Sequence, residues 1–186
     1  MGLIKEIDDH LGELFKWLDE TGKADETMII FTSDHGDYMG DHWMGEKELF
    51  HECSVRVPLI IFDPRSEADA TRGMATDALV ESIDLLPTVL EAKEIDLSAF
   101  THRLEGRSLQ PLLHGEADAD WRECVFSEID WCFYAVREML GTGYNDSRGY
   151  MIRTARWKYI YFKGFPPQLF DLESDPNEFV DLGTDP

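Results

Sequence analysis

The chain has 186 residues with 38 acidic and 17 basic side chains, and a formal net charge of −21 excludes nucleic-acid and anionic-membrane partners, which need clustered lysine and arginine. Hydrophobic residues make up 43%, enough for one core, and no apolar run approaches the roughly 20 residues of a membrane span. Three cysteines without a CxxC pair, and a start without signal-peptide character, favour a cytoplasmic location.

The sequence pattern of the first half of the chain predicts an α/β fold. Apolar residues at helical spacing predict an amphipathic helix over residues 3–20, with Gly22 as its stop. Residues 27–31 and 57–62 are continuous apolar runs, typical of strands buried on both faces of a parallel sheet. The polar segment 33–55 between them is longer than most connections, which indicates a functional loop.

The second half changes character near residue 124. Before it, the pattern predicts a short strand over 75–81, a helix over 84–93 capped by Asp84, and a short helix over 106–113. After it, short β-rich segments separated by turn residues predict an antiparallel sheet. Its expected strands are 125–128, 133–137, 150–154 and 157–162.

These elements divide the chain into an α/β part, residues 1–120, and a small antiparallel β subdomain with an acidic tail, residues 121–186. Two buried-type strands are too few for a complete α/β sheet, and little else in the chain can flank them. The sequence therefore predicts a portion of a larger sheet.

The segment that follows the first strand carries the chemistry. Asp34 and His35 stand where the strand ends, the edge at which open α/β sheets bind ligands, and Gly36 permits a sharp turn. A carboxylate next to an imidazole suits a divalent metal. The alternative is an aspartate that caps a turn and a histidine that bonds to backbone.

Several segments resemble the sulfatase family of the alkaline-phosphatase superfamily. The main match is TMIIFTSDHGDYMGDH at 27–42, followed by Lys47 and by HECSVRVPLII at 51–61. Further matches are GLIKEIDDHLG at 2–12, SIDLLPTVL at 82–90, GRSL at 106–109 and QLFDLESDPNE at 168–178. Asp-His with a lysine thirteen residues after the aspartate is most similar to the phosphonate monoester hydrolase and phosphodiesterase branch.

The resemblance implies a fold and a set of site residues. The fold is the C-terminal part of an alkaline-phosphatase-like central sheet flanked by helices, followed by a small antiparallel sheet. Asp34 and His35 match metal ligands, with manganese or zinc favoured over calcium because of the imidazole. Lys47 matches a catalytic lysine that contacts the sulfate or phosphoryl oxygens. Tyr38, His42 and His51 are candidate substrate-pocket residues, with loop packing as the alternative.

The family's nucleophile motif is absent from the printed residues. That motif is Cys/Ser-x-Pro-x-Arg, whose cysteine or serine becomes formylglycine, and Cys53 lacks both its proline and its arginine. We expect Cys124 and Cys132 to be small core residues. The resemblance thus implies that the chain is a C-terminal portion, inactive alone, and that an N-terminal half or another chain supplies the nucleophile and covers the sheet.

The predicted function is hydrolysis of a small anionic ester, a sulfate, phosphate or phosphonate. Two alternatives stay open: a phosphotransferase or mutase of the same superfamily, and a non-catalytic remnant or interaction module of the same fold. The sequence leaves the natural substrate and the oligomeric state open.

Overall fold

A computed structural model describes residues 2–98, 100–116, 120–132 and 134–183. Its α-helices are α1 (Gly2–Glu20), α2 (Glu52–Val55), α3 (Leu85–Ala92), α4 (Gln110–Leu113) and α5 (Tyr134–Leu140). Its strands are β1 (Ile29–Thr32), β2 (Leu59–Phe62), β3 (Cys124–Asp130), β4 (Arg148–Thr154), β5 (Trp157–Phe162) and β6 (Gln168–Asp171). Short 3₁₀ turns are η1 (Ala24–Glu26), η2 (Asp41–Trp43), η3 (Ser66–Thr71), η4 (Ser82–Asp84) and η5 (Tyr144–Asp146).

The predicted first helix is confirmed as α1. It ends before Gly22, whose φ of 66° is the left-handed conformation that glycine adopts without strain. Among the residues of α1, only Leu18 is buried, while Leu3, Ile4 and Trp17 are exposed. The apolar face that the sequence predicts therefore lies open in this chain.

The strands β1 and β2 form a two-stranded ribbon, and the predicted parallel pairing is wrong. They pair antiparallel, with Ile29 opposite Phe62 and Thr32 opposite Leu59. Phe31 and Ile60 are also exposed. A continuous apolar run indicates that a strand is buried in a complete sheet, but it does not indicate the direction of the strand. A connection as long as 33–58 can join either parallel or antiparallel strands.

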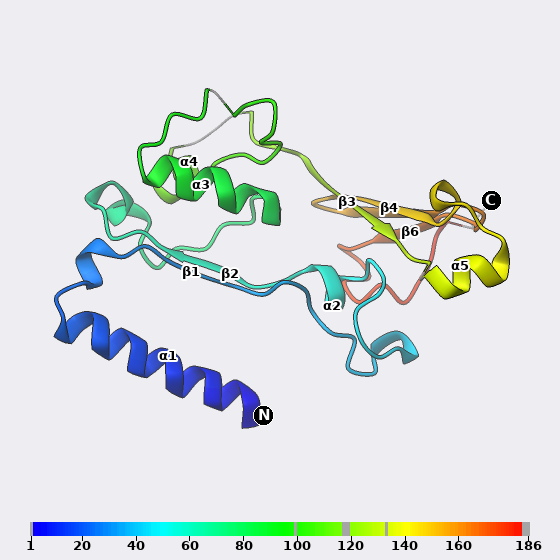
Figure 1. Ribbon diagram of the computed structural model, residues 1–186, viewed down its shortest axis with the longest axis horizontal. Helices are drawn as coiled ribbons and strands as arrows, with labels where there is room; N and C mark the ends of the chain where they lie inside the picture. The colour runs from blue at the N-terminus through cyan, green and yellow to red at the C-terminus, as the bar shows by residue number, and fades with distance from the viewer. Residues whose placement is uncertain (1, 99, 117–119, 133, 184–186) are drawn as a thin grey trace.

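Helices lie on both sides of this ribbon (Figure 1), with α1 on one side and α3 and α4 on the other. The strand predicted over 75–81 is absent, since those residues belong to no strand, helix or turn. Asp84 does not cap α3, because its carboxylate accepts from Glu81 N–H and from both terminal nitrogens of Arg122. A buried carboxylate binds a nearby guanidinium in preference to a single cap donor.

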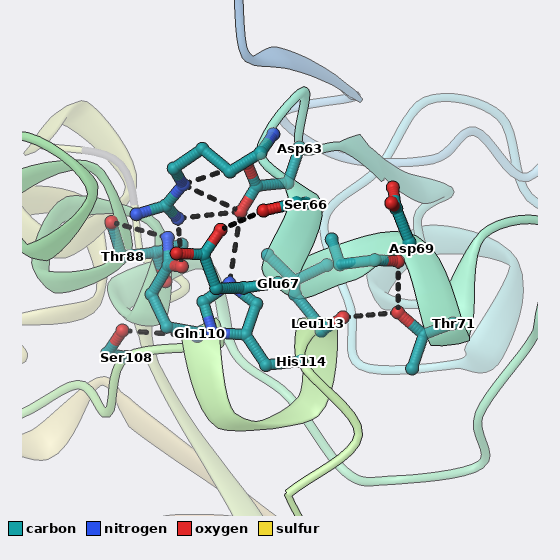
Figure 2. A network of polar contacts seen from close by, with 12 residues as sticks. Asp63, Ser66, Glu67, Asp69, Thr71, Thr88, Ser108, Gln110, Leu113 and His114 are labelled. Carbon is teal, nitrogen blue, oxygen red and sulfur yellow. Dashed lines mark hydrogen bonds and ion pairs between the residues drawn. The ribbon is translucent and has the colours of Figure 1, made fainter.

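A polar network fixes the chain where β2 ends (Figure 2). Asp63 is buried, and it accepts hydrogen bonds from Arg65 N–H at 3.0 Å and Nε at 2.9 Å. The His114 Nε2 atom lies 3.2 Å from the same carboxylate, and Arg65 also contacts the Gln110 side chain. The network therefore ties the end of β2 to α4 and the residue that follows it.

The second sheet has the strand order β3-β4-β5-β6, and all of its pairs are antiparallel as predicted. The strand predicted over 133–137 is wrong where it can be compared: residue 133 lies outside the described residues, and residues 134–137 belong to helix α5. Cys132 is buried as expected, whereas Cys124 is exposed because it begins the edge strand β3. The core of this part is Phe50, Met151, Ile160, Phe170 and Leu172.

The accessible surface of the molecule is larger than that of a compact monomer of the same mass. Its accessible surface is 13159 Å², whereas a compact monomer of 21.4 kDa exposes roughly 9,000 Å². Much of the excess is apolar, on α1, β2 and β3. Among the described residues, no helix combines the length and the apolar character that crossing a membrane requires.

Candidate functional site

The turn after β1 presents Asp34 to solvent. The Asp34 side chain is 84% exposed, and its Oδ1 accepts a hydrogen bond from the His35 backbone N–H at 3.0 Å. That hydrogen bond lowers the pKa of Asp34 below its ordinary value. The carboxylate is therefore ionised at neutral pH, and among the described residues it has no lysine or arginine partner.

The imidazole of His35 turns toward the same point. Its Nδ1 lies 2.6 Å from the carbonyl oxygen of Gly36, which can only accept, so Nδ1 carries the proton. In the neutral ring Nε2 then has the lone pair, and it lies 3.4 Å from Asp34 Oδ2. A carboxylate oxygen and an unprotonated imidazole nitrogen thus converge, and a backbone carbonyl fixes the tautomer, as is usual for metal-binding histidines.

Gly36 docks this turn against helix α2. Its N–H donates to Ser54 O at 2.6 Å, and a Cβ atom there would lie 1.9 Å from Cys53 O. No side chain fits at that distance. The glycine is thus required by close backbone approach rather than by an unusual dihedral angle.

Lys47 is exposed, and its backbone is held by the same helix. Ser54 is buried, and its hydroxyl donates to Lys47 O at 2.8 Å. A second bond, from Tyr38 N–H to Glu46 O at 2.9 Å, closes the intervening loop. Helix α2 therefore contacts both the Asp34–His35 turn, through Gly36, and the segment that carries Lys47.

Tyr38, His42 and His51 form one aromatic cluster inside the loop. The buried Tyr38 hydroxyl lies 2.7 Å from His51 Nδ1, and the His42 and His51 rings stack at 4.0 Å. Burial lowers the pKa of His51 to about 4, helped by His42 and Lys158, and burial raises that of Tyr38. These contacts are those of internal packing, and the role of the three residues as pocket residues stays a prediction.

The backbone of the loop that carries this cluster is strained at four positions. Met39, His42, Trp43 and Glu46 have φ between 48° and 62°, the left-handed region that side chains other than glycine rarely adopt. Trp43 and Met39 are also almost fully exposed. Such strain persists only where surrounding contacts impose it, and it clusters at functional sites.

Sequence reasoning missed the residues that anchor helix α2. These are Glu52, Arg153, Lys158 and Glu178, which meet in a buried ion-pair cluster. One signal was present: β5 alternates, and Lys158 falls on the same face as the core residue Ile160. A lysine at an inward position of a strand indicates a buried partner of opposite charge.

The donors at the turn fit part of a metal site. Within the described part of the chain, no group of three or more His, Cys, Asp and Glu side chains gathers as a metal would require. Asp34 and His35 alone supply two converging donors of types that a divalent ion accepts. The remaining ligands of such a site would have to come from elsewhere.

Comparison with known proteins shows extended similarity. A family model described as Sulfatase matches residues 1–95. Over its whole length the chain is 41% identical to the multifunctional alkaline phosphatase superfamily protein PehA of Trinickia caryophylli, and the match covers 36% of that protein. Over 97% of its length the chain is also 34% identical to an arylsulfatase of Clostridium perfringens, and that match covers 34% of the arylsulfatase.

The fold has counterparts among solved structures. The phosphonate monoester hydrolase of Agrobacterium radiobacter matches with a TM-score of 0.87 and 34% identity, over 98% of this chain and 36% of that one. The chain thus spans about a third of the length of the curated relatives it matches.

Proposed function

The chain belongs to the sulfatase family, and from this membership we propose that the protein carrying these residues is a metal-dependent hydrolase of sulfate, phosphate or phosphonate esters. Homologues named as sulfatases and phosphonate monoester hydrolases support the reaction class. The substrate would be a small anionic ester.

One observation carries the proposal: two donors of different type converge at the end of β1. The exposed, ionised Asp34 carboxylate and the Nε2 lone pair of His35 lie 3.4 Å apart, and neither is neutralised by a lysine or arginine among the described residues. We propose that they hold a divalent metal, with manganese or zinc favoured because one ligand is imidazole. When bound, such an ion polarises the ester and stabilises its negative charge.

Lys47 would act on the transferred group. Its ammonium is exposed while its backbone is fixed by Ser54, so the charge is free to meet an anion. A fixed cation stabilises the charge that develops on the sulfuryl or phosphoryl oxygens. We therefore assign Lys47 the role of transition-state stabilisation and Asp34 and His35 that of metal ligands.

The printed residues alone should not perform the reaction. They contain no Cys/Ser-x-Pro-x-Arg sequence, and in the described residues only two of the candidate ligands converge. We propose that a formylglycine nucleophile and the other ligands come from polypeptide outside these 186 residues.

The test uses the complete natural polypeptide that carries these residues, assayed with an aryl sulfate and a phosphonate monoester. Asp34→Asn should remove bound metal, measured by elemental analysis, and lower kcat/KM at least about 100-fold, because the carboxylate charge is lost. Lys47→Ala should lower kcat by a similar factor but leave the metal content unchanged.

Lys5→Ala is the matched control, since Lys5 is an exposed lysine of α1 whose one ion-pair partner among the described residues is Asp9. It should change neither turnover nor metal content. Full activity and full metal content in Asp34→Asn would refute the site. Turnover by the 186 residues alone would refute the part of the proposal that places the nucleophile outside them.

A further inference from the structure

A lysine from the distant antiparallel sheet is completely buried against the loop of the candidate site. The Lys158 side chain, on β5, has no exposed surface. Its Nζ donates to Phe50 O at 2.9 Å and lies 2.7 Å from both Glu52 Oε1 and Glu178 Oε1. The contact with Glu178 is an ion pair by distance and is not aligned as a hydrogen bond. Lysine is almost never fully buried unless it is paired in this way.

The cluster is centred on the first residue of α2. Glu52 also accepts from Arg153 Nε at 3.1 Å, so Lys158 and Arg153 meet two carboxylates, and the exposed Arg56 lies at the edge, 4.0 Å from Glu52 Oε2. The second oxygen of Glu178 accepts the Glu52 backbone N–H at 2.6 Å. Residues about a hundred positions later in the chain therefore fix the start of a four-residue helix.

That short helix is the part of the loop that contacts both halves of the candidate site. Ser54 O accepts the Gly36 N–H, and the Ser54 hydroxyl donates to Lys47 O. A helix of one turn has too few internal hydrogen bonds to hold its own position. Its placement depends on Glu52 and hence on Lys158. In Figure 1, α2 lies between the β1–β2 ribbon and the second sheet.

We propose that Lys158 is a positioning residue for the candidate site. With Glu52 and Glu178 it sets the position of α2, and α2 sets the Asp34–His35 turn relative to the segment that carries Lys47. The effect on catalysis rests on the proposed function, whereas the effect on the loop does not. Lys158 touches neither substrate nor metal in this proposal.

The first measurement is amide hydrogen exchange in the complete natural polypeptide. Lys158→Met should speed exchange of the Gly36 and Glu52 amides at least about tenfold, because the acceptor of the Gly36 N–H, Ser54 O, and the Glu52 N–H itself both move with α2. The Ile160 amide in the paired strand β5 should stay within about twofold of the wild type. Lys158→Arg should restore slow exchange, because it keeps the charge.

The second measurement is turnover of a phosphonate monoester. Lys158→Met should lower kcat at least about tenfold and change KM less than about threefold, because Lys47 acts on charge that develops in the transition state. Lys158→Arg should recover most of kcat. Lys163→Met, at the lysine that directly follows β5 and whose ammonium pairs with Asp146, should leave both measurements unchanged.

A milder variant covers the case in which Lys158→Met unfolds the sheet. Glu178→Gln keeps an acceptor for the Glu52 N–H but removes one charge, and it should also speed exchange at Gly36 with Ile160 unchanged. Equal acceleration at Gly36 and Ile160 in both variants, or unchanged exchange at Gly36, would overturn the positioning role. A wild type without turnover would refute the proposed function, and the exchange measurement would still decide the role of Lys158.

Discussion

At the scale of single residues, burial decides which side chains titrate. His51 packs between Tyr38 and His42 and next to Lys158, where an added proton would be costly. Burial, with the two neighbouring bases, holds the pKa of His51 at about 4 against an ordinary value of 6.5. Between about pH 4 and pH 6.5, the folded protein therefore binds fewer protons at His51 than the unfolded chain does.

The pH dependence of stability follows from His51. Because its folded pKa is depressed, stability is full above the unfolded value of 6.5 and falls as pH drops toward 4. Between pH 7.5 and 5, the free energy of unfolding should decrease by up to about 2 kcal/mol from this residue. Urea unfolding at several pH values measures the change.

The control separates His51 from the other titrating groups. His51→Asn keeps an acceptor for the Tyr38 hydroxyl and should remove most of this slope between pH 7.5 and 5. His10→Asn changes an exposed histidine of α1 and should leave the slope intact. An unchanged slope in His51→Asn would contradict the assignment.

At the scale of elements, polar clusters at strand ends hold the ribbon and the helices together. Asp63 follows β2 directly and joins it to Arg65 and His114 (Figure 2). Burial alone raises the pKa of Asp63, and the hydrogen bonds from Arg65 and His114 outweigh it and bring the pKa to about 2. The carboxylate is thus charged and paired across the neutral range.

Replacement of Asp63 by asparagine should destabilise the protein by about 2 kcal/mol, because an amide cannot accept from all of its donors and leaves Arg65 without a counter-charge. Since the folded pKa is depressed, the difference from wild type should be full above about pH 4 and shrink toward pH 2. Chemical unfolding measures both effects. Asp69→Asn, at an exposed pair with Arg72, should cost less than about 0.5 kcal/mol, and an equal loss would contradict the argument.

At the scale of the whole molecule, apolar side chains of the ribbon and of α1 are exposed in this chain, and we propose that further polypeptide covers them. Ile60 on β2 is 63% exposed, and Phe126 on β3 and the apolar face of α1 are exposed as well. Exposed apolar area of this extent usually marks an interface. The relatives, about three times as long as this chain, have polypeptide that could cover it.

One substitution should behave differently in the two contexts. Ile60→Thr keeps a β-branched residue, and in the 186-residue chain it should change the free energy of unfolding by less than about 0.5 kcal/mol because the side chain is already exposed. In the complete natural polypeptide it should cost about 1.5–2 kcal/mol if the side chain is covered. Urea unfolding of both forms measures the difference, and equal costs would contradict the inferred cover.

Local sequence patterns are enough to predict helix α1 with its glycine stop, the strands β1 and β2, the antiparallel second sheet, and the family. The roles of Asp34, His35 and Lys47 and the division at residue 120 were also predicted from it and stay predictions. Neighbouring residues at the end of a strand lie close together whatever the rest of the chain does. Their order in the sequence is therefore enough to predict that they are near one another.

Local patterns did not predict the direction of β2, the helix α5, the exposure of Cys124 or the cluster around Lys158, which became visible in the folded chain. The β1–β2 pairing and the Lys158 cluster join residues far apart in the chain, and neither the hydrophobic period nor a local motif shows which distant residues pair. Lys158 and Glu52 are 106 positions apart, as the printed numbering shows, and no local pattern pairs them. The candidate site was thus predicted from neighbouring residues and stays a prediction, while the parts that hold its loop in place could not be predicted, because their partners come from a different sheet.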